Sequence, residues 1–538
     1  LGPTPTPGIL DLRNWDMKLL NRYKPLYAPI CDLCCLCTYG KCDLSQGRRG
    51  ACGIDIATQQ ARIVLIACCI GSSAHIAHAR HMVNHLIEEY GSDHHLDMGK
   101  EINVEAPLIR TVYGIKPETL RDLEDVLNWC EEQVVHCVSS TATGQEADSL
   151  DYESKALHVS MVDQVGMEVA DIAQIAAFNF PKGDPEAPLV ETGLGTVDKD
   201  KPVVLCIGHN VSSGVEAVDY LEKSGLMGQV QMCGLCCTSH DLSRYEKARH
   251  ARVKVVGPLS QQLRFVRSGI ADVIMVDEQC VRLDVLSEAK ARMTPVIATS
   301  DKICIGLPDR TMDPADQIVE DLYNGALGVI ISDARKAGEV AIKTAVKIAP
   351  KRSKLKGQLL STEELQKYAK SCTGCQQCMR VCPNNLPIEE AIQSAAKVER
   401  NSLQKLAELY EPCLGCGKCE DACQRKIPIH SMITKAAEKL IAEEKHKLRA
   451  GRGPILDTEI REVGAPIVFG EIPGVIAIVG CPNYKGSFKD VGKIAEEFLK
   501  RRYIVVVSGC EAMDIARYRT EDGESLYEKY SGRIDAGG

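Results

Sequence analysis

The chain has 538 residues, of which 45% are hydrophobic and 25% are charged, and its formal net charge is −9. A chain of this length exceeds one hydrophobic core, so we expect about three or four domains. It has no basic run and no basic–aromatic stripe, which argues against nucleic acid as a partner. Its continuous apolar runs are only of strand length, so no membrane span is predicted.

The cysteine content is unusual. The chain contains 26 cysteines, whereas disulfide-dense scaffolds are usually short secreted chains. The first residues, Leu1-Gly2-Pro3, open a segment with neither a basic nor an apolar region, so no signal peptide is predicted, and we expect the true N-terminus to lie upstream. We therefore interpret the cysteines as metal ligands of a cytoplasmic protein.

The first cysteine group lies between residues 31 and 52, where six cysteines exceed the four that one [4Fe–4S] cluster needs. Cys34 and Cys35 are adjacent and cannot easily face the same cluster. We expect four of the six to hold an internal cluster and Cys31 and Cys35 to supply half of another ligand set. A homodimer would supply the other half, because a two-fold axis duplicates each residue. The alternative is a redox-active or zinc-binding loop.

Three histidines follow at helical spacing. His75, His78 and His81 stand at i, i+3 and i+6, which places them along one face of a helix. Histidines in such a line can pass protons near neutral pH. The alternative is a polar helix face with packed imidazoles.

From residue 200 the pattern alternates between strands and helices. Strands are predicted at 203–208, 230–235, 253–257, 272–276, 296–299 and 328–331, with helices at 214–224, 260–268 and 316–325 between them. Such alternation is typical of a doubly wound parallel sheet. A second, incomplete unit shows two clear strands, at 475–479 and 503–507, around a helix at 490–501.

Metal ligands of soft or borderline character stand at the ends of five predicted strands. They are His209, Cys237 with its neighbour Cys236, Cys280, Cys481 and Cys510. Ligands of open α/β sheets bind outside the carboxyl ends of the strands, so we expect a shared metal site. The alternative is a set of buried core thiols. No well-placed G-x-G-x-x-G occurs, so a nicotinamide cofactor is not supported.

Two tandem cysteine quartets lie between these units. The first, Cys372, Cys375, Cys378 and Cys382, matches C-x2-C-x2-C-x3-C-P, and Cys413, Cys416, Cys419 and Cys423 repeat its spacing. In two-cluster ferredoxins the fourth cysteine of each quartet ligates the other cluster. We therefore assign Cys423 to the cluster of the first quartet and Cys382 to that of the second. A zinc ribbon, with two separated C-x2-C knuckles, fits this spacing poorly. Amphipathic helices at 387–398 and 429–445 would pack over the clusters.

The predicted fold class is therefore α/β and multidomain. We expect a mostly helical N-terminal cluster domain over 1–199, a Rossmann-like parallel-sheet domain over 200–354, an inserted ferredoxin-like two-cluster segment over 355–450, and a second, incomplete Rossmann-like domain over 451–538.

These motifs, over essentially the whole chain, resemble the alpha subunit of the archaeal acetyl-CoA decarbonylase/synthase complex, a nickel-containing carbon monoxide dehydrogenase. The resemblance rests on residues 31–52, 71–80, 207–210, 234–238, 276–280, 480–483 and 509–514 and on the two ferredoxin motifs. It implies reversible conversion of CO and H2O to CO2, two protons and two electrons, with the [4Fe–4S] clusters passing electrons to ferredoxin. It also implies an α2ε2 assembly with a small epsilon subunit, CO exchange with an acetyl-CoA synthase subunit, and an anaerobic archaeal cytoplasm.

The resemblance also implies roles for the candidate residues. Cys34, Cys37, Cys42 and Cys52 would hold a B-type [4Fe–4S] cluster, and Cys31 and Cys35 half of a D-type cluster shared across the homodimer. His209, Cys237, Cys280, Cys481 and Cys510 would hold a Ni–4Fe–4S C-cluster, with Cys236 as an alternative ligand. His75 would stand beside CO or CO2, and His78 and His81 would carry protons outward.

Two departures separate this chain from that pattern. The family's sixth C-cluster cysteine would come after Gly538, where the sequence ends, so the chain is expected to be a piece truncated at both ends. Glu511 replaces the family's glycine after the last ligand, in Gly509-Cys510-Glu511-Ala512. The alternative function is accordingly a non-catalytic iron–sulfur electron-transfer subunit that lacks a complete nickel site.

Overall fold

The computed structural model describes residues 32–37, 41–98, 106–142, 149–176, 189–300, 306–397, 399, 401–449, 474–531 and 533–537. The chain divides into two compact units, Leu1–Phe180 and Pro181–Gly538. The division into four domains stays a prediction. Residues 189–192, placed in the first of those domains, form a strand of the sheet in the second unit.

The first unit is built on long helices. Its elements are the short strands β1 (Leu33–Cys34) and β2 (Cys42–Asp43), the helices α2 (Ile56–Tyr90), α3 (Leu120–Ser139) and α4 (Ser149–Ala176), and a π-helical turn at Ile109–Tyr113. The Asp55 side chain accepts the Thr58 N–H at the start of α2, and Thr119 forms a capping box with Asp122 at the start of α3. These bonds satisfy backbone donors that a helix leaves free at its N-terminus.

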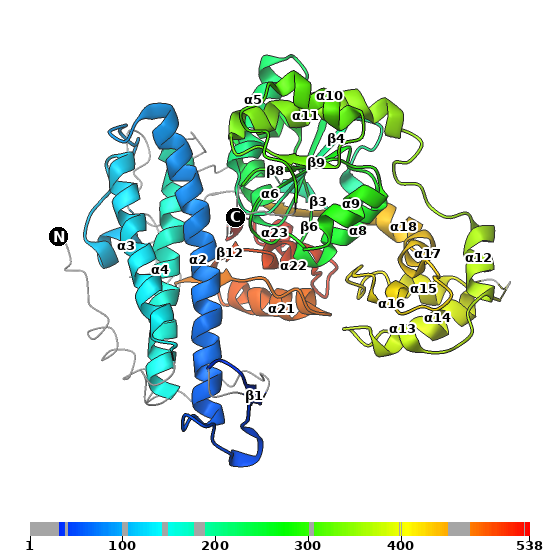
Figure 1. Cartoon of the computed structure of the whole chain (residues 1–538), viewed down its shortest axis with the longest axis horizontal. Coiled ribbons are helices and arrows are strands. Elements are labelled where there is room, and N and C mark those ends of the chain that lie inside the picture. Colours follow the sequence, from blue (N-terminus) through cyan, green and yellow to red (C-terminus); the bar gives the residue numbers. More distant parts are fainter. Residues whose placement is uncertain are drawn as a thin grey trace. The chain divides into compact units, whose positions relative to one another are not determined.

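Helix α2 runs along both α3 and α4 (Figure 1). The contact with α4 is close, because a Cβ on Gly166 would lie 2.9 Å from Cγ1 of Ile76. By length and composition α2 is the one helix of the described residues that could cross a membrane, a candidate that continuous apolar runs did not predict. This is weak evidence for a span, because core helices pass the same test and α2 packs against two neighbours.

The second unit contains an eight-stranded mixed sheet, in the order β10-β3-β6-β5-β4-β7-β8-β9. Its strands are β3 (Leu189–Thr192), β4 (Val203–Ile207), β5 (Gln231–Leu235), β6 (Lys254–Gly257), β7 (Val273–Val276), β8 (Val296–Ala298), β9 (Gly328–Ile330) and β10 (His446–Arg449). Only the β10–β3 pair is antiparallel. The six predicted strands are present within about one residue, whereas β3 and β10 were not predicted.

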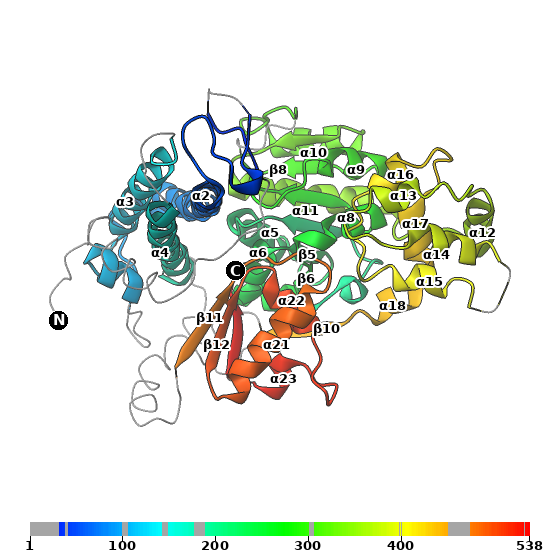
Figure 2. The ribbon, with the colours of Figure 1, turned by 90° about the horizontal axis from the view of Figure 1, so that it is seen from below.

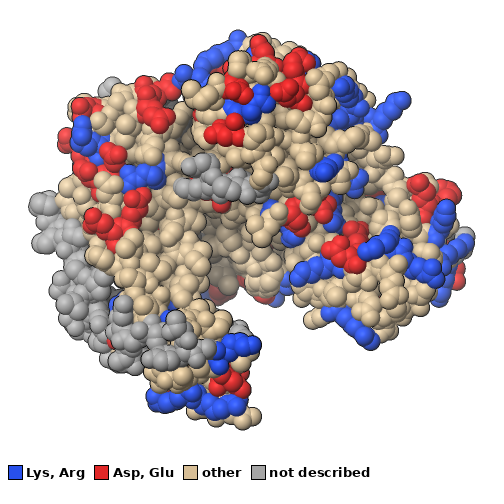
Figure 3. Space-filling view, in the orientation of Figure 1, with Lys and Arg blue, Asp and Glu red and all other residues tan. Residues whose placement is uncertain are grey.

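Helices connect and cover these strands (Figure 1). They are α5 (Ser212–Lys223), α6 (Cys237–Arg244), α7 (Glu246–Ala251), α8 (Gln262–Ser268), α9 (Val285–Ala291), α10 (Ala315–Tyr323) and α11 (Ala334–Arg352). On the face shown in Figure 3, acidic and basic side chains of the described residues are interspersed over this part of the chain.

A small helical module with its own hydrophobic core follows α11. Its helices are α12 (Thr362–Lys370), α13 (Gln377–Arg380), α14 (Ile388–Ala395), α15 (Gln404–Glu408), α16 (Lys418–Asp421), α17 (Ile429–Ala436) and α18 (Glu438–Glu443). The pairs α13/α16 and α14/α17 repeat one arrangement, as the tandem motifs predicted. The single helix expected over 429–445 is instead two helices, divided at Ala437.

A second sheet completes the unit (Figure 2). Strands β11 (Val475–Val479), β12 (Ile504–Ser508) and β13 (Ile534–Gly537) are parallel, with helices α21 (Ser487–Lys500), α22 (Glu511–Arg517) and α23 (Leu526–Lys529). The sequence had predicted only two of these strands. Buried residues of both sheets belong to one hydrophobic core. The loop after β12 also reaches the turn that follows β6 of the larger sheet, because the Leu259 N–H donates to Sγ of Cys510.

Candidate metal centres

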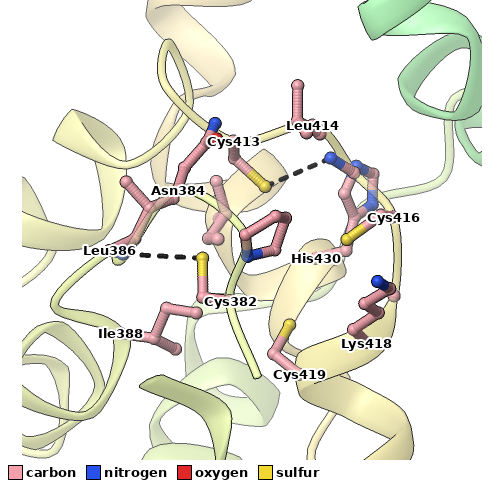
Figure 4. Close-up of a pocket in the computed structure, with 14 residues that line it drawn as sticks. Cys382, Asn384, Leu386, Ile388, Cys413, Leu414, Cys416, Lys418, Cys419 and His430 are labelled. Carbon is pink, nitrogen blue, oxygen red and sulfur yellow. Dashed lines mark hydrogen bonds between the residues drawn. The ribbon is translucent and has the colours of Figure 1, made fainter. Parts of the chain in front are cut away.

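Two cavities in the helical module are lined by the two cysteine quartets. One is partly open to solvent, has an empty volume of about 380 Å³, and is lined by Cys372, Cys375, Cys378 and Cys423. The other is also partly open, has an empty volume of about 430 Å³, and is lined by Cys382, Cys413, Cys416 and Cys419 (Figure 4). The structure thus brings together the crossed sets that the sequence assigned, with the fourth cysteine of each quartet facing the other cavity.

The local backbone explains how each quartet turns toward its cavity. Gln376 and Gly417 adopt left-handed conformations, with φ of 60° and 78°, directly before α13 and α16. Backbone N–H groups point at sulfur: Gly415 donates to Sγ of Cys413 at 3.3 Å, and Leu386 to Sγ of Cys382 at 3.5 Å (Figure 4). Such N–H···S bonds favour thiolates and tune iron–sulfur clusters.

An imidazole lines the second of these cavities, and an arginine holds the loop beside it. His430 lines it, and burial, with nearby arginines, lowers the pKa of His430 to about 3. Arg264 of α8 donates to the carbonyl oxygens of Glu411, at 2.8 Å, and Cys413, at 3.0 Å from Nε. The loop that carries the second quartet is therefore attached to the large sheet through α8.

In the first unit, the N-terminal cysteines lie on a short hairpin. Cys34 of β1 stands opposite Cys42 of β2, and the Ala51 N–H donates to Sγ of Cys42 at 3.4 Å. Cys34 is buried whereas Cys35 is exposed, so these neighbours face different surroundings, as the ligand count required. Cys37 and Cys52 are also partly or fully exposed. Cys31 lies outside the described residues.

The three histidines lie on α2, as predicted. Nδ1 of His75 is 2.9 Å from Oδ1 of Asp163 on α4, and a carboxylate bonded to one ring nitrogen fixes the imidazole tautomer. His78 is buried and His81 is half-buried. Sequence reasoning missed Asp163, because its partner is 88 residues away.

In the second unit, the five strand-end ligands converge. His209 follows β4, Cys237 follows β5 and Cys280 follows β7, while Cys481 and Cys510 follow β11 and β12 of the second sheet. Sγ of Cys280 is 3.9 Å from Nε2 of His209. Cys236 also belongs to the group, because its thiol interacts with those of the four other cysteines.

Glycines allow the loops to approach this closely. A Cβ on Gly509 would lie 2.2 Å from the carbonyl oxygen of Gly480 and 3.3 Å from Sγ of Cys481. Gly509 has a φ of 99°, which glycine adopts without strain. Cys236 and Cys280 also take positive φ values, 64° and 53°, but their Cβ atoms make this conformation unfavourable. Strained backbone of this kind is concentrated at functional sites.

The electrostatics of the thiol group favour a bound cation. A hydrogen bond to Cys510 lowers the pKa of Cys236, but burial and the neighbouring thiolates outweigh it and raise that pKa to about 11. Burial and the other cysteines raise the pKa of Cys237 well above its ordinary value. Several thiolates held this close together therefore repel one another unless a positive charge lies between them. Thiolates are the form that binds soft metals, so this donor set fits a thiophilic metal or cluster.

Asp277 holds two of the ligand loops together. Its carboxylate accepts the N–H groups of His209 and Asn210, both at 2.5 Å, and of Gln279, at 2.8 Å. Gly208 makes this possible, since a Cβ there would lie 1.9 Å from Oδ1 of Asp277. Sequence reasoning did not single out Asp277, although its place three residues before Cys280, at the end of β7, was a usable signal.

Comparison with known proteins places the chain in a family. The model of the Prismane/CO dehydrogenase family matches residues 32–98 and 94–532. The acetyl-CoA decarbonylase/synthase complex subunit alpha of Methanothermobacter thermautotrophicus is 58% identical over 538 residues, which cover 100% of this chain and 68% of that protein. The corresponding subunit of Methanocaldococcus jannaschii is 53% identical, also with 100% and 68% coverage.

Solved structures agree on the fold. A nickel-free carbon monoxide dehydrogenase from Thermococcus sp. AM4 superposes with a TM-score of 0.57 at 18% identity, covering 96% of this chain and 75% of that one. Carbon monoxide dehydrogenase IV from Carboxydothermus hydrogenoformans gives 0.53 at 17% identity, with 96% and 76% coverage. The chain therefore belongs to the Prismane/CO dehydrogenase family, among the alpha subunits of acetyl-CoA decarbonylase/synthase complexes.

Proposed function

We propose that this chain is the carbon monoxide dehydrogenase subunit of an acetyl-CoA decarbonylase/synthase complex. It would interconvert CO and H2O with CO2, two protons and two electrons. The convergence of His209, Cys237, Cys280, Cys481 and Cys510 from two sheets is the observation that carries the proposal. A chance set of core thiols would not place one ligand at each of five strand ends around one point.

These five residues would hold a Ni–4Fe–4S C-cluster, with Cys236 as a neighbouring or alternative ligand. When bound, the nickel would offer a soft open site for CO and the adjacent iron a Lewis acid for water. The α6 N-terminus lies at Cys237, and Cys510 is the N-cap of α22. Helix N-termini stabilise negative charge, so both thiols are well placed to act as thiolates.

The proton-handling residues belong to the first unit. We propose that His75, whose Nδ1 is hydrogen-bonded to Asp163, exchanges a proton with the substrate. His78 and His81 follow on the same helix face and would carry the proton onward. Asp163 would keep the ring of His75 oriented.

Electron transfer would use the remaining cysteines. The cavities lined by the two quartets would each hold a [4Fe–4S] cluster and pass electrons to ferredoxin. Cys34, Cys37, Cys42 and Cys52 would hold the B-type cluster. Cys35, with Cys31, would contribute to a D-type cluster in a homodimer. Exposure of Cys35 beside the buried Cys34 supports that division. The relatives are named as alpha subunits of an acetyl-CoA decarbonylase/synthase complex, which supports a synthase subunit as a partner. A small epsilon subunit is proposed on the resemblance of the sequence alone.

The test compares two buried cysteines. Cys510→Ser should remove nickel and CO-dependent reduction of a viologen dye, whereas Cys206→Ser, inside β4, should leave both within twofold of the unmodified protein. A chain whose nickel content and CO oxidation are unchanged by Cys510→Ser would contradict the proposed site. A protein that holds iron at its other clusters, with neither nickel nor CO oxidation, would be an electron-transfer subunit.

A further inference from the structure

The turn between β6 and α8 supplies none of the proposed ligands, yet it contacts three of the loops that do. The Leu259 N–H donates to Sγ of Cys510 at 3.3 Å. The next N–H, of Ser260, donates to Oδ1 of Asn483 at 2.9 Å. Asn483 in turn donates through Nδ2 to the carbonyl oxygen of Cys481 at 3.2 Å. Two consecutive amides of one turn thus fix the loops after β12 and β11.

The third loop is held by the first residue of α8. The Gln262 side chain is fully buried. Its Nε2 donates to the carbonyl oxygen of Cys280 at 2.7 Å, and its Oε1 accepts the Arg282 N–H at 2.9 Å. The amide therefore brackets the turn in which Cys280 takes a φ of 53°, a conformation that a non-glycine residue keeps only when its surroundings impose it.

The turn is itself rigidly supported. Phe265 and Val266 of α8 are buried in the hydrophobic core that both sheets share. Arg264 attaches the other side of α8 to the Cys413 loop. Groups outside the ligand set that orient the ligands usually matter about tenfold or more for metal retention. A turn anchored in the core and bonded to three ligand loops has this role.

We propose that the β6–α8 turn positions the Cys280, Cys481 and Cys510 loops for metal binding, and that Gln262 is its principal positioning side chain. This inference rests on the proposed metal centre. It predicts that Gln262 acts through the backbone around Cys280, without touching the metal or the substrate.

The experiment uses the full chain purified anaerobically and compares two variants. Gln262→Met removes both hydrogen bonds at similar side-chain volume, and Gln358→Met is the control at an exposed site. Nickel per chain should fall about tenfold in Gln262→Met, with a matching loss of the nickel-dependent electron paramagnetic resonance signal. Alkylation of Cys280 by N-ethylmaleimide, followed by mass spectrometry, should become about tenfold faster. Cys130, in the first unit, should react at an unchanged rate.

A general loss of structure in Gln262→Met would accelerate the alkylation of Cys130 as much as that of Cys280. A second variant guards against that case. Gln262→Glu keeps the size and the acceptor for Arg282 but loses the donor to Cys280, and should accelerate alkylation at Cys280 alone. If both variants keep the nickel content and the Cys280 reactivity of Gln358→Met, the inference is wrong. If the unmodified protein holds no nickel, the proposed function fails, while the alkylation comparison still decides the role of Gln262.

Discussion

Arg264 offers the sharpest test of how the small helical module, α12 to α18, is attached to the large sheet. Its buried guanidinium donates to the carbonyl oxygens of Tyr410, Glu411 and Cys413 and lies 4.4 Å from the centre of the Tyr410 ring. Arg264→Met would leave these carbonyls without their charged donor. Bonds to charged groups contribute about 1.5–3 kcal/mol each and are not additive, so we expect a loss of about 3 kcal/mol in local stability.

A loss of that size corresponds to a factor of roughly 150 in the opening equilibrium of the loop. Amide hydrogen exchange followed by mass spectrometry should therefore show residues 413–419 exchanging about a hundredfold faster in Arg264→Met. Arg501→Met is the matched control, because Arg501 is exposed, follows directly after α21 and forms a surface ion pair with Glu497. Equal protection of the loop in the two variants would refute the reasoning.

Three further predictions concern other parts of the chain. Cys382→Ser should remove the iron–sulfur signal of the Cys413–Cys419 cluster and spare the other, a result that redox titration by electron paramagnetic resonance can resolve. Gly208→Ala should cost most of the nickel, because its Cβ would overlap Asp277, whereas Gly225→Ala, which points into open space, should retain it. Burial lowers the pKa of His158 to about 4. The stability that its neutral form contributes is therefore full above pH 6.5 and is lost as the pH falls toward 4. The free energy of opening of the helical unit, measured by hydrogen exchange, should be about 2 kcal/mol lower at pH 5 than at pH 7. His158→Gln should abolish this difference.

Much of the second unit could be predicted from the sequence because its strands are buried on both faces. Runs such as Val203–Ile207 are continuously apolar and end at glycine, which fixes both their type and their limits. The polar strand His446–Arg449 has no such signal, since it pairs antiparallel with β3 at the edge of the sheet. The break at Ala437 was invisible for a similar reason, because alanine favours helix and only the packing of α17 and α18 reveals it.

The candidate site divides in the same way. Cysteine and histidine reveal ligands through their chemistry and spacing, so the convergent set of ligands could be predicted from the sequence. The residues that hold the ligands could not, because glutamine and aspartate are common polar residues and their partners are distant in the chain. Gln262 is 18 residues from Cys280, and Asp277 is 68 from His209. Only tertiary structure brings these pairs into contact.

The proposed nickel-dependent carbon monoxide dehydrogenase function is tested most directly by metal analysis and CO-dependent dye reduction on one anaerobically purified sample. For this function we predict about one nickel per chain, iron sufficient for the other clusters, and CO oxidation that rises in proportion to nickel across preparations. Iron at the expected level, with no nickel and no CO oxidation after reconstitution with nickel, would contradict it.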